Sequence, residues 1–288
     1  MQQSGAPGTV SKILWHFTGG PRWNTEEKCQ EVAPKPVGEA FDALCGILRT
    51  KELRLGSYRE AVSVEVPIAR RDPATGNRLP NYKIVYRESA PVCCVADIPI
   101  AHLSYHASRY GKIAIGFHRD AVVSAGFNPV FYTLQHSPVL RSLHRGFGEL
   151  ETIDIDTVLL ISRDCIESGL KDAQCDFGHP VRLSDSITSK VASNISVISD
   201  VATAADERLK HFLAFVKTFA LDEFSTIYCE REWRSTKTFS FKLEDIAMIV
   251  LPKTGGTNFF GQFVEAVDPP LGLPRTVPIV PWEDLVEH

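Results

Sequence analysis

Two short segments, far apart in the chain, carry side chains that could do chemistry together. Residues 230–234 read Glu-Arg-Glu-Trp-Arg, and residues 14–18 read Leu-Trp-His-Phe-Thr. Successive side chains of a β-strand point to opposite faces, so the two glutamates share one face, and so do His16 and Thr18. If these polar faces meet, a histidine, a hydroxyl group and paired carboxylates lie in one place. The pattern indicates a site but does not fix its reaction.

The two carboxylates, Glu230 and Glu232, are the candidates for catalysis. Side chains two positions apart on a strand lie about 7 Å from each other. Like charges at such a distance raise the pKa of both groups. Trp233 is expected in the core, which would turn the carboxylates toward a cleft or toward water. The alternative is an exposed strand face on which Arg234 offsets the charge.

The N-terminal segment has its own two interpretations. His16 and Thr18 are followed by Gly19 and Gly20. A glycine pair after a strand lets a ligand approach the backbone closely, which would make this a binding segment. The alternative is a structural histidine whose hydrogen bonds are satisfied within the protein, followed by an ordinary turn.

Metal and disulfide sites are not predicted. His102 and His106 are one helical turn apart, a spacing that metal ligands use, but no glutamate lies between them in an HExxH pattern and no third ligand is evident. The seven cysteines contain no CxxC pair. Reduced thiols are the simplest interpretation, and the adjacent Cys93 and Cys94 are expected to be buried.

The bulk composition narrows the class of protein. The net charge of −4 argues against a general polyanion binder, although the basic loop at 69–83 could contact phosphates of a nucleic acid. The alternative for that loop is a solvated turn. Residues 1–12 lack the apolar stretch of a signal peptide, and no apolar run approaches the ~18 residues of a membrane span. We therefore expect a cytoplasmic protein without a membrane partner.

The pattern of elements predicts the fold class. Strands and helices mix without a regular βαβ alternation, which favours an α+β fold with a mixed, mainly antiparallel sheet and flanking helices. We expect residues 1–12 to form a flexible tail and residues 13–288 a single domain. Extended Pro-rich chain is expected at 264–279. The periodicity predicts helices at 38–50, 98–110, 119–125, 200–220 and 282–286, and strands at 13–18, 53–55, 62–66, 83–96, 112–117, 128–132, 153–162, 225–235, 237–241 and 246–251.

Several motifs, taken in order, resemble a known family. They are Trp15-His16-Phe17-Thr18-Gly19, Leu44-Cys45-Gly46-Ile47-Leu48 before Leu53-Arg54-Leu55, Cys94-Val95-Ala96-Asp97-Ile98-Pro99-Ile100, His106 through Tyr110-Gly111 into Ile115-Gly116-Phe117, Asn128-Pro129-Val130-Phe131-Tyr132 and Tyr228-x-Glu230-x-Glu232-Trp233-Arg234. This order is similar to the AbiGi family of bacterial abortive-infection proteins, over roughly residues 13–251. The family is described as the proposed antitoxin partner of a nucleotidyltransferase-like toxin.

A more distant resemblance concerns chemistry. The His-Phe-Thr strand and the late glutamate pair are similar to ADP-ribosyltransferases, including the DNA-modifying DarT type, although no middle-strand Ser-Thr-Ser motif is found. The resemblance implies that His16, Thr18 and Gly19 bind NAD as a substrate. It also implies that Glu232 stabilises the oxocarbenium-like transition state as nicotinamide leaves. Glu230 would face the acceptor, and Arg54 or Tyr110 would contact the cofactor.

Two functions follow. The first is a phage-defence protein with an ADP-ribosyltransferase-like fold and NAD-dependent transferase or glycohydrolase activity. The second is a non-catalytic antitoxin or regulator that binds a cognate toxin, a phage component or its own promoter.

Overall fold

The structure is a computed structural model that describes residues 11–24, 26–27, 29–56, 58–71, 75, 78–135, 137–143, 207–221 and 230–286. The chain divides into two compact units. The sheet unit contains residues 1–61, 88–134 and 213–288, and the hairpin unit contains residues 62–87 and 135–212. The single domain predicted for 13–288 stays a prediction, and the predicted tail falls mostly outside the described residues.

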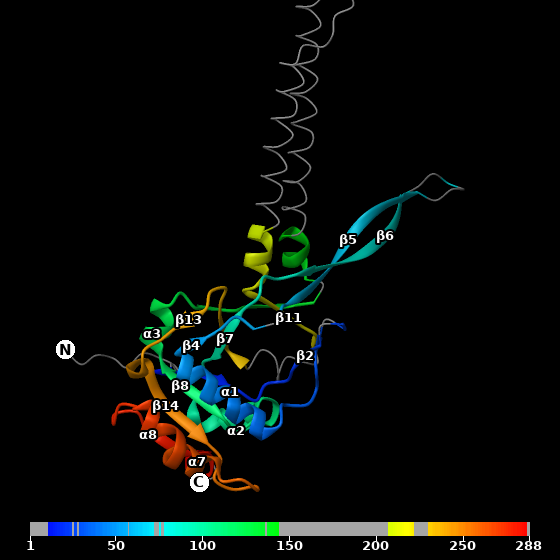
Figure 1. Cartoon of the computed structure of the whole chain (residues 1–288). Helices are drawn as coiled ribbons and strands as arrows, with labels where there is room; N and C mark the ends of the chain where they lie inside the picture. The colour runs from blue at the N-terminus through cyan, green and yellow to red at the C-terminus, as the bar shows by residue number, and fades with distance from the viewer. Residues whose placement is uncertain are drawn as a thin grey trace, which may run out of the picture. The chain divides into compact units, whose positions relative to one another are not determined.

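A seven-stranded sheet organises the sheet unit (Figure 1). Five of its six strand pairs are antiparallel and one, β14 with β15, is parallel. This confirms the predicted α+β class with a mixed, mainly antiparallel sheet. In sheet order the strands are β15 (Ile279–Pro281), β14 (Ile246–Leu251), β8 (Ala114–His118), β1 (Ile13–Phe17), β7 (Cys93–Ala96), β12 (Glu232–Ser235) and β9 (Asn128–Pro129).

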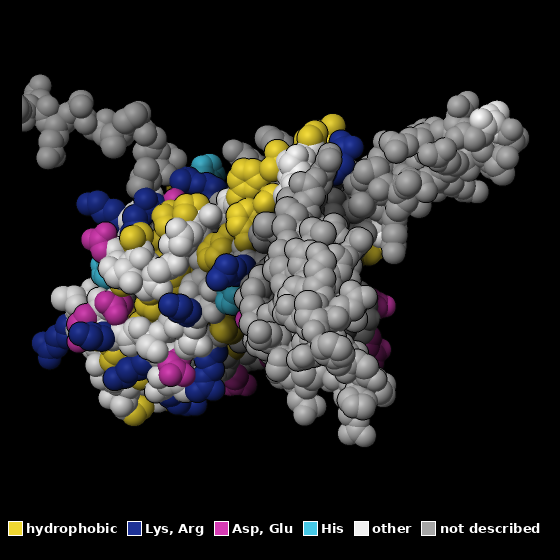
Figure 2. Space-filling view, turned by 90° about the horizontal axis from the view of Figure 1, so that it is seen from above, with side chains coloured by type: hydrophobic (Ala, Val, Ile, Leu, Met, Phe, Trp, Pro, Cys, Tyr) yellow, Lys and Arg dark blue, Asp and Glu magenta, His cyan; other side chains and the backbone are white. Residues whose placement is uncertain are grey.

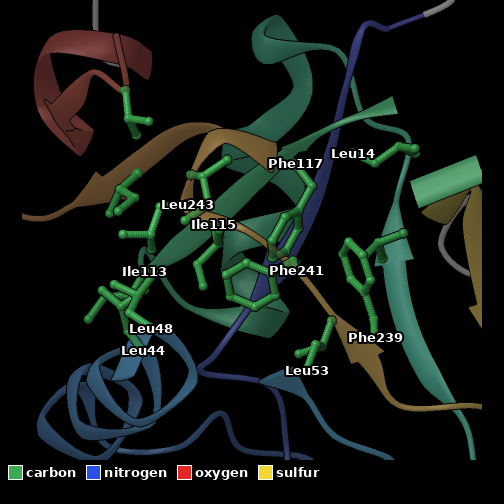
Figure 3. Close-up of a cluster of buried hydrophobic side chains, with 14 of the residues drawn as sticks. Leu14, Leu44, Leu48, Leu53, Ile113, Ile115, Phe117, Phe239, Phe241 and Leu243 are labelled. Atoms are coloured by element: carbon green, nitrogen blue, oxygen red, sulfur yellow. The ribbon is translucent and has the colours of Figure 1, made fainter. Parts of the chain in front are cut away.

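Strand β1 has side chains in both cores because it lies in the middle of the sheet. Leu14 is fully buried in one core with Ile115 and Phe117 (Figure 3). Trp15 and Phe17 point to the opposite face and pack in a second core with residues of α2 (Leu103–Tyr110). The predicted alternation of β1 is therefore confirmed, but both of its faces are covered.

Helix α1 (Val37–Thr50) supports the first core. Its buried residues follow the 3.6-residue period that predicted a helix at 38–50; they are Ala40, Phe41, Leu44, Cys45 and Leu48. The predicted helix at 98–110 appears as a 3-10 turn (Ile100–His102) that leads into α2. Helix α3 (Arg119–Ser124) is followed by Gly126 at φ 84°, the left-handed conformation that helix ends favour.

Short elements complete the described chain. Near the C-terminus, α7 (Phe259–Gln262), a π-helix (Phe263–Val267), α8 (Asp268–Leu271) and α9 (Trp282–Val286) follow β14. No helix in the described part of the chain is long and apolar enough to cross a membrane. The strand pairs outside the seven-stranded sheet are β2 (Trp23–Asn24) with β3 (Cys29–Gln30), β4 (Glu52–Leu53) with β13 (Phe239–Ser240), the long β5 (Ala61–Arg71) with β6 (Arg78–Glu88), and β10 (Phe131–Leu134) with β11 (Val216–Phe219).

Three predicted segments are wrong. Most of the predicted loop 69–83 belongs to β5 and β6. The helix expected at 200–220 is present over 207–213, but the chain then forms β11, because pairing with β10 overrides the apolar helical spacing. The extended chain expected at 264–279 is helical up to Leu271, since Pro269 and Pro270 occupy the first turn of α8, where no backbone N–H is needed. The strand predicted at 153–162 lies outside the described residues.

A carboxylate of α9 holds the chain that leaves β14. Glu283, 8% exposed, accepts hydrogen bonds from the backbone N–H of Lys253 at 3.0 Å and from the hydroxyl of Thr254 at 2.6 Å. Burial disfavours the carboxylate, but these hydrogen bonds prevail and lower the pKa of Glu283 to about 2.

We expect Glu283→Gln to lower the free energy of unfolding by about 2 kcal/mol at pH 7, because hydrogen bonds to a charged acceptor are replaced by weaker ones. The folded-state pKa is depressed, so this stabilisation is present above pH 4.5 and disappears as the pH falls toward 2. Urea unfolding at pH 7 and pH 3 should show the two proteins converging at the lower pH. The exposed Glu265→Gln is the control, and an equal gap at both pH values would contradict the assignment.

Candidate functional site

The two segments singled out in the sequence meet at one cavity of about 160 Å³. The cavity lies where β1 and β7 are paired at a single position, Trp15 with Ala96, although β1 pairs with β8 over five positions. Its described lining comes from β1, β7, α2, β11 and the start of β12, together with residues of the connecting loops: Trp15, His16, Phe17, Gly20, Gln30, Tyr58, Cys94, Val95, Ala96, His106, Tyr110, Lys217, Glu230 and Glu232.

A group of ion pairs, which we call the ion-pair cluster, forms one wall. Lys217 Nζ lies 2.6 Å from Glu230 Oε2 and 3.0 Å from Glu232 Oε2. Arg234 Nη2 lies 2.9 Å from Glu232 Oε2 and 2.9 Å from Glu60 Oε2. Arg109, which is more exposed, reaches Glu230 Oε1 at 3.1 Å. The cluster therefore contains three carboxylates and three cations.

The carboxylates at the start of β12 face the cavity, as the alternation predicted, but the charged face of the strand is buried more deeply than Trp233. Glu232 is 9% exposed and Arg234 is fully buried, whereas Trp233 is only partly buried and packs beneath Arg119. The reason is that the carboxylate face receives Lys217 from β11, which makes its burial possible. Arg231 has a left-handed backbone, φ 44°, and its guanidinium pairs with Asp97 at 2.9 Å.

The predicted rise in carboxylate pKa is wrong for Glu232. Burial alone would raise the pKa of Glu232, but the adjacent charges of Arg234 and Lys217 outweigh burial and bring it well below its usual range. Burial likewise opposes the charged form of Lys217, yet Glu232 and Glu230 raise the pKa of Lys217 well above its usual value. Both partners are therefore charged at neutral pH, and neither is poised as a general base or a nucleophilic amine.

His16 is held as a neutral ring. Its Nδ1–H donates to the carbonyl oxygen of Cys94 at 2.9 Å, because a carbonyl can only accept. Burial lowers the pKa of His16 to about 4. The ring therefore presents Nε2 as an acceptor near neutral pH.

Aromatic rings form another wall of the cavity. His106 stacks on Tyr110 with 4.3 Å between ring centroids and lies 4.8 Å from Phe17. The Tyr110 hydroxyl donates to Glu230 Oε1 at 2.9 Å, which joins this wall to the ion-pair cluster. Burial lowers the pKa of His106 to about 4, so this ring is also neutral at pH 7.

The structure brings together four of the seven predicted site residues. His16, Tyr110, Glu230 and Glu232 line the cavity. Thr18 does not line it, because its hydroxyl donates to the backbone oxygen of Ala40 on α1 at 2.7 Å.

The other two predicted site residues also lie elsewhere. At Gly19 the chain packs closely against the backbone of Tyr110. A Cβ added at Gly19 would lie 2.7 Å from the backbone carbonyl oxygen of Tyr110. Arg54 is exposed and pairs with Glu52 at 3.0 Å. Trp15 and Phe17 also line the cavity.

Sequence reasoning missed Lys217, Glu60 and Arg109. Lys217 fell inside the predicted helix 200–220, where a lysine is ordinary. Its partners are 13 and 15 residues away, and Glu60 is 174 residues from Arg234. Such pairings leave no local pattern, so no motif could have found them.

Metal and thiol chemistry find no support in the described residues. His102 is exposed while His106 is buried, and no group of three His, Cys, Asp or Glu side chains in the described ranges could hold a metal ion. Cys45, Cys93 and Cys94 are free thiols. Burial raises the pKa of Cys93 to about 12, which makes its thiolate inaccessible near neutral pH.

Fold and site together define an α+β protein with a mixed sheet and a small central cavity whose carboxylates are held in ion pairs. A family model described as "Putative abortive phage resistance protein AbiGi, antitoxin" matches residues 70–254. The match covers more than half of the chain, so the chain belongs to the AbiGi abortive phage resistance family, as the order of motifs predicted. Comparisons with curated proteins and with solved structures gave no match.

We expect Glu232→Gln to lower the free energy of unfolding by about 3–5 kcal/mol, because it leaves two buried cations short of a counter-charge. Urea unfolding at pH 7 measures this. The matched control is Glu52→Gln, which breaks an ion pair that is also two residues apart but exposed, and which should change the stability by less than about 1 kcal/mol. Equal effects of the two substitutions would contradict the role of the cluster.

The neutral His106 should make the protein acid-sensitive. Its folded-state pKa, about 4, lies below the ordinary 6.5, so the unfolded chain takes up the proton first as the pH falls. The contribution of neutral His106 to the free energy of unfolding is therefore complete above pH 6.5 and is lost as the pH approaches 4. We expect His106→Phe to flatten the stability profile between these limits, by up to about 3 kcal/mol. Unfolding series with the exposed His102→Phe as control check this, and an unchanged slope in His106→Phe would contradict it.

Proposed function

We propose that this protein is the antitoxin of a toxin–antitoxin pair in phage defence and that it acts by binding a cognate toxin. The membership of the AbiGi family, whose description names an antitoxin, supports this. The observation that carries it on the structural side is the ion-pair cluster, in which Lys217 and Arg234 already neutralise Glu232.

The charge balance of the cluster argues against catalysis. A carboxylate stabilises a developing cation through an uncompensated charge aimed at the reacting atom. Glu232 instead accepts three hydrogen bonds, from Arg234 Nε, Arg234 Nη2 and Lys217 Nζ. The cavity of about 160 Å³ is also smaller than the roughly 300–1,000 Å³ of typical ligand pockets, which counts against a whole dinucleotide such as NAD.

The surface favours a protein partner over a nucleic acid. On the face shown in Figure 2, Lys and Arg side chains are spread among Asp and Glu, and a group of apolar side chains is exposed. Independently of that view, Phe131 and Leu134 of β10 are 50% and 43% exposed. Exposed apolar groups of this kind commonly mark protein interfaces, whereas a polyanion binder needs clustered positive charge. Promoter binding through residues 69–83 is a secondary proposal.

NAD turnover is the second candidate, favoured by one observation. His16, Tyr110, Glu230 and Glu232 line the same cavity, as the resemblance to ADP-ribosyltransferases implies. This candidate requires an ADP-ribosyltransferase-like fold and a rearrangement that frees Glu232 from Lys217.

Co-expression with the neighbouring toxin gene distinguishes the two candidates. We expect wild-type protein expressed alone to be harmless, to release no nicotinamide from NAD and to restore growth of toxin-expressing cells. Because Glu232→Gln alone is destabilising, the informative variant is Lys217→Met with Glu232→Gln, which removes one charge of each sign and preserves the balance of the cluster.

The antitoxin function predicts that this double variant still restores growth at a matched protein level. The transferase function predicts the reverse: nicotinamide release by the wild type, lost in the double variant. Release of nicotinamide together with toxicity of the wild type alone would overturn the proposal.

A further inference from the structure

The size of the cavity corresponds to a single aromatic ring. Its volume is about 160 Å³, and an apolar protein cavity of roughly 150 Å³ is known to accommodate benzene. Its walls include the rings of Trp15, Phe17, Tyr58, His106 and Tyr110. A flat ring could therefore gain stacking contacts on more than one side.

Two buried polar groups at this cavity have unused hydrogen-bonding capacity. His106 is 9% exposed, and no residue in the described part of the chain hydrogen-bonds to its ring nitrogens; its contacts are the ring stacks with Phe17 and Tyr110. Lys217 is 7% exposed and has three N–H donors, of which Glu230 and Glu232 take two. The His106 ring nitrogens are not among the fully enclosed polar atoms that lack a partner. They are therefore accessible from the cavity that His106 lines, where a ligand can hydrogen-bond to them.

The charges limit what that ligand can be. The three carboxylates and three cations of the ion-pair cluster are already paired. A charged ligand would bring an uncompensated charge into this buried site, which is strongly unfavourable. The third N–H of Lys217 calls for a hydrogen-bond acceptor, while the neutral ring of His106 and Nε2 of His16 can accept from a donor.

We propose that the cavity binds an uncharged single-ring heteroaromatic molecule with a carbonyl oxygen beside a ring N–H, the chemistry of a pyrimidine base. Lys217 donates to the carbonyl oxygen, and the neutral imidazole of His106 accepts from the ring N–H. The proposal does not depend on antitoxin function, because it concerns binding by the isolated protein.

Titration calorimetry with the full chain tests it, with uracil as the probe. We expect one uracil per chain. Two compounds are the controls: 1,3-dimethyluracil, in which methyl groups block both ring N–H groups, and benzene, a six-membered ring of similar size with no polar group. Each should bind at least about tenfold more weakly, the effect of losing a well-placed hydrogen bond.

The matched protein variants are His106→Phe and His102→Phe. His106→Phe keeps a ring against Phe17 and Tyr110 but removes both nitrogens, so it should fold and yet weaken uracil binding about tenfold. His102→Phe, one turn away and exposed, should bind like the wild type. Circular dichroism and thermal unfolding verify that each variant is folded. Absence of uracil binding up to its solubility limit, benzene binding as tightly as uracil, or unchanged binding in folded His106→Phe would each overturn the proposal.

Discussion

The fully buried guanidinium of Arg234 is the constraint on which this site depends. A charge without access to water must be paired, since leaving it alone is far more costly than any packing gain. Arg234 therefore requires Glu232 on its own strand, Glu60 from a distant part of the chain, and the carbonyl oxygens of Ala214 and Val216. These contacts fix how β11 and β12 lie beside each other and bring Lys217 to Glu232 as well.

The cavity is a consequence of the same arrangement. Strands β7 and β12 pair over four positions, but β7 and β1 pair at one. Where β7 and β1 separate, side chains of α2 and of the ion-pair cluster fill only part of the space. The cavity is the part that remains. A sheet interrupted in this way exposes polar and aromatic groups from several strands to one small volume, a common way for a fold to form a binding site.

Local pattern was sufficient for elements whose signal lies in their own residues. The stripe of α1, the alternation of β1 and the glycine after α3 each have a signature within a few residues, and all three are present. It failed where a distant partner decides the outcome. Residues 216–219 have the apolar spacing of a helix but become a strand because β10 is available for pairing, and Pro269 and Pro270 were interpreted without knowing that they begin a helix. The site followed the same rule. The histidine motif of β1 and the glutamate motif of β12 could be found locally, but Lys217 and Arg109, which pair with the glutamates, could not.

A Glu-x-Glu pair on a strand is therefore ambiguous in principle. Its local sequence is the same whether the carboxylates face a substrate or hold a buried cation. What separates the two cases is the charge that other segments bring to them, because a carboxylate with two cations at hydrogen-bonding distance has little electrostatic capacity left for a transition state. In this chain Arg109 and Lys217 supply cations from other segments, and Arg234 supplies one from the same strand. The glutamates are consequently better understood as the means by which the sheet unit buries positive charge beside its cavity, and that role is compatible with a protein that works by binding.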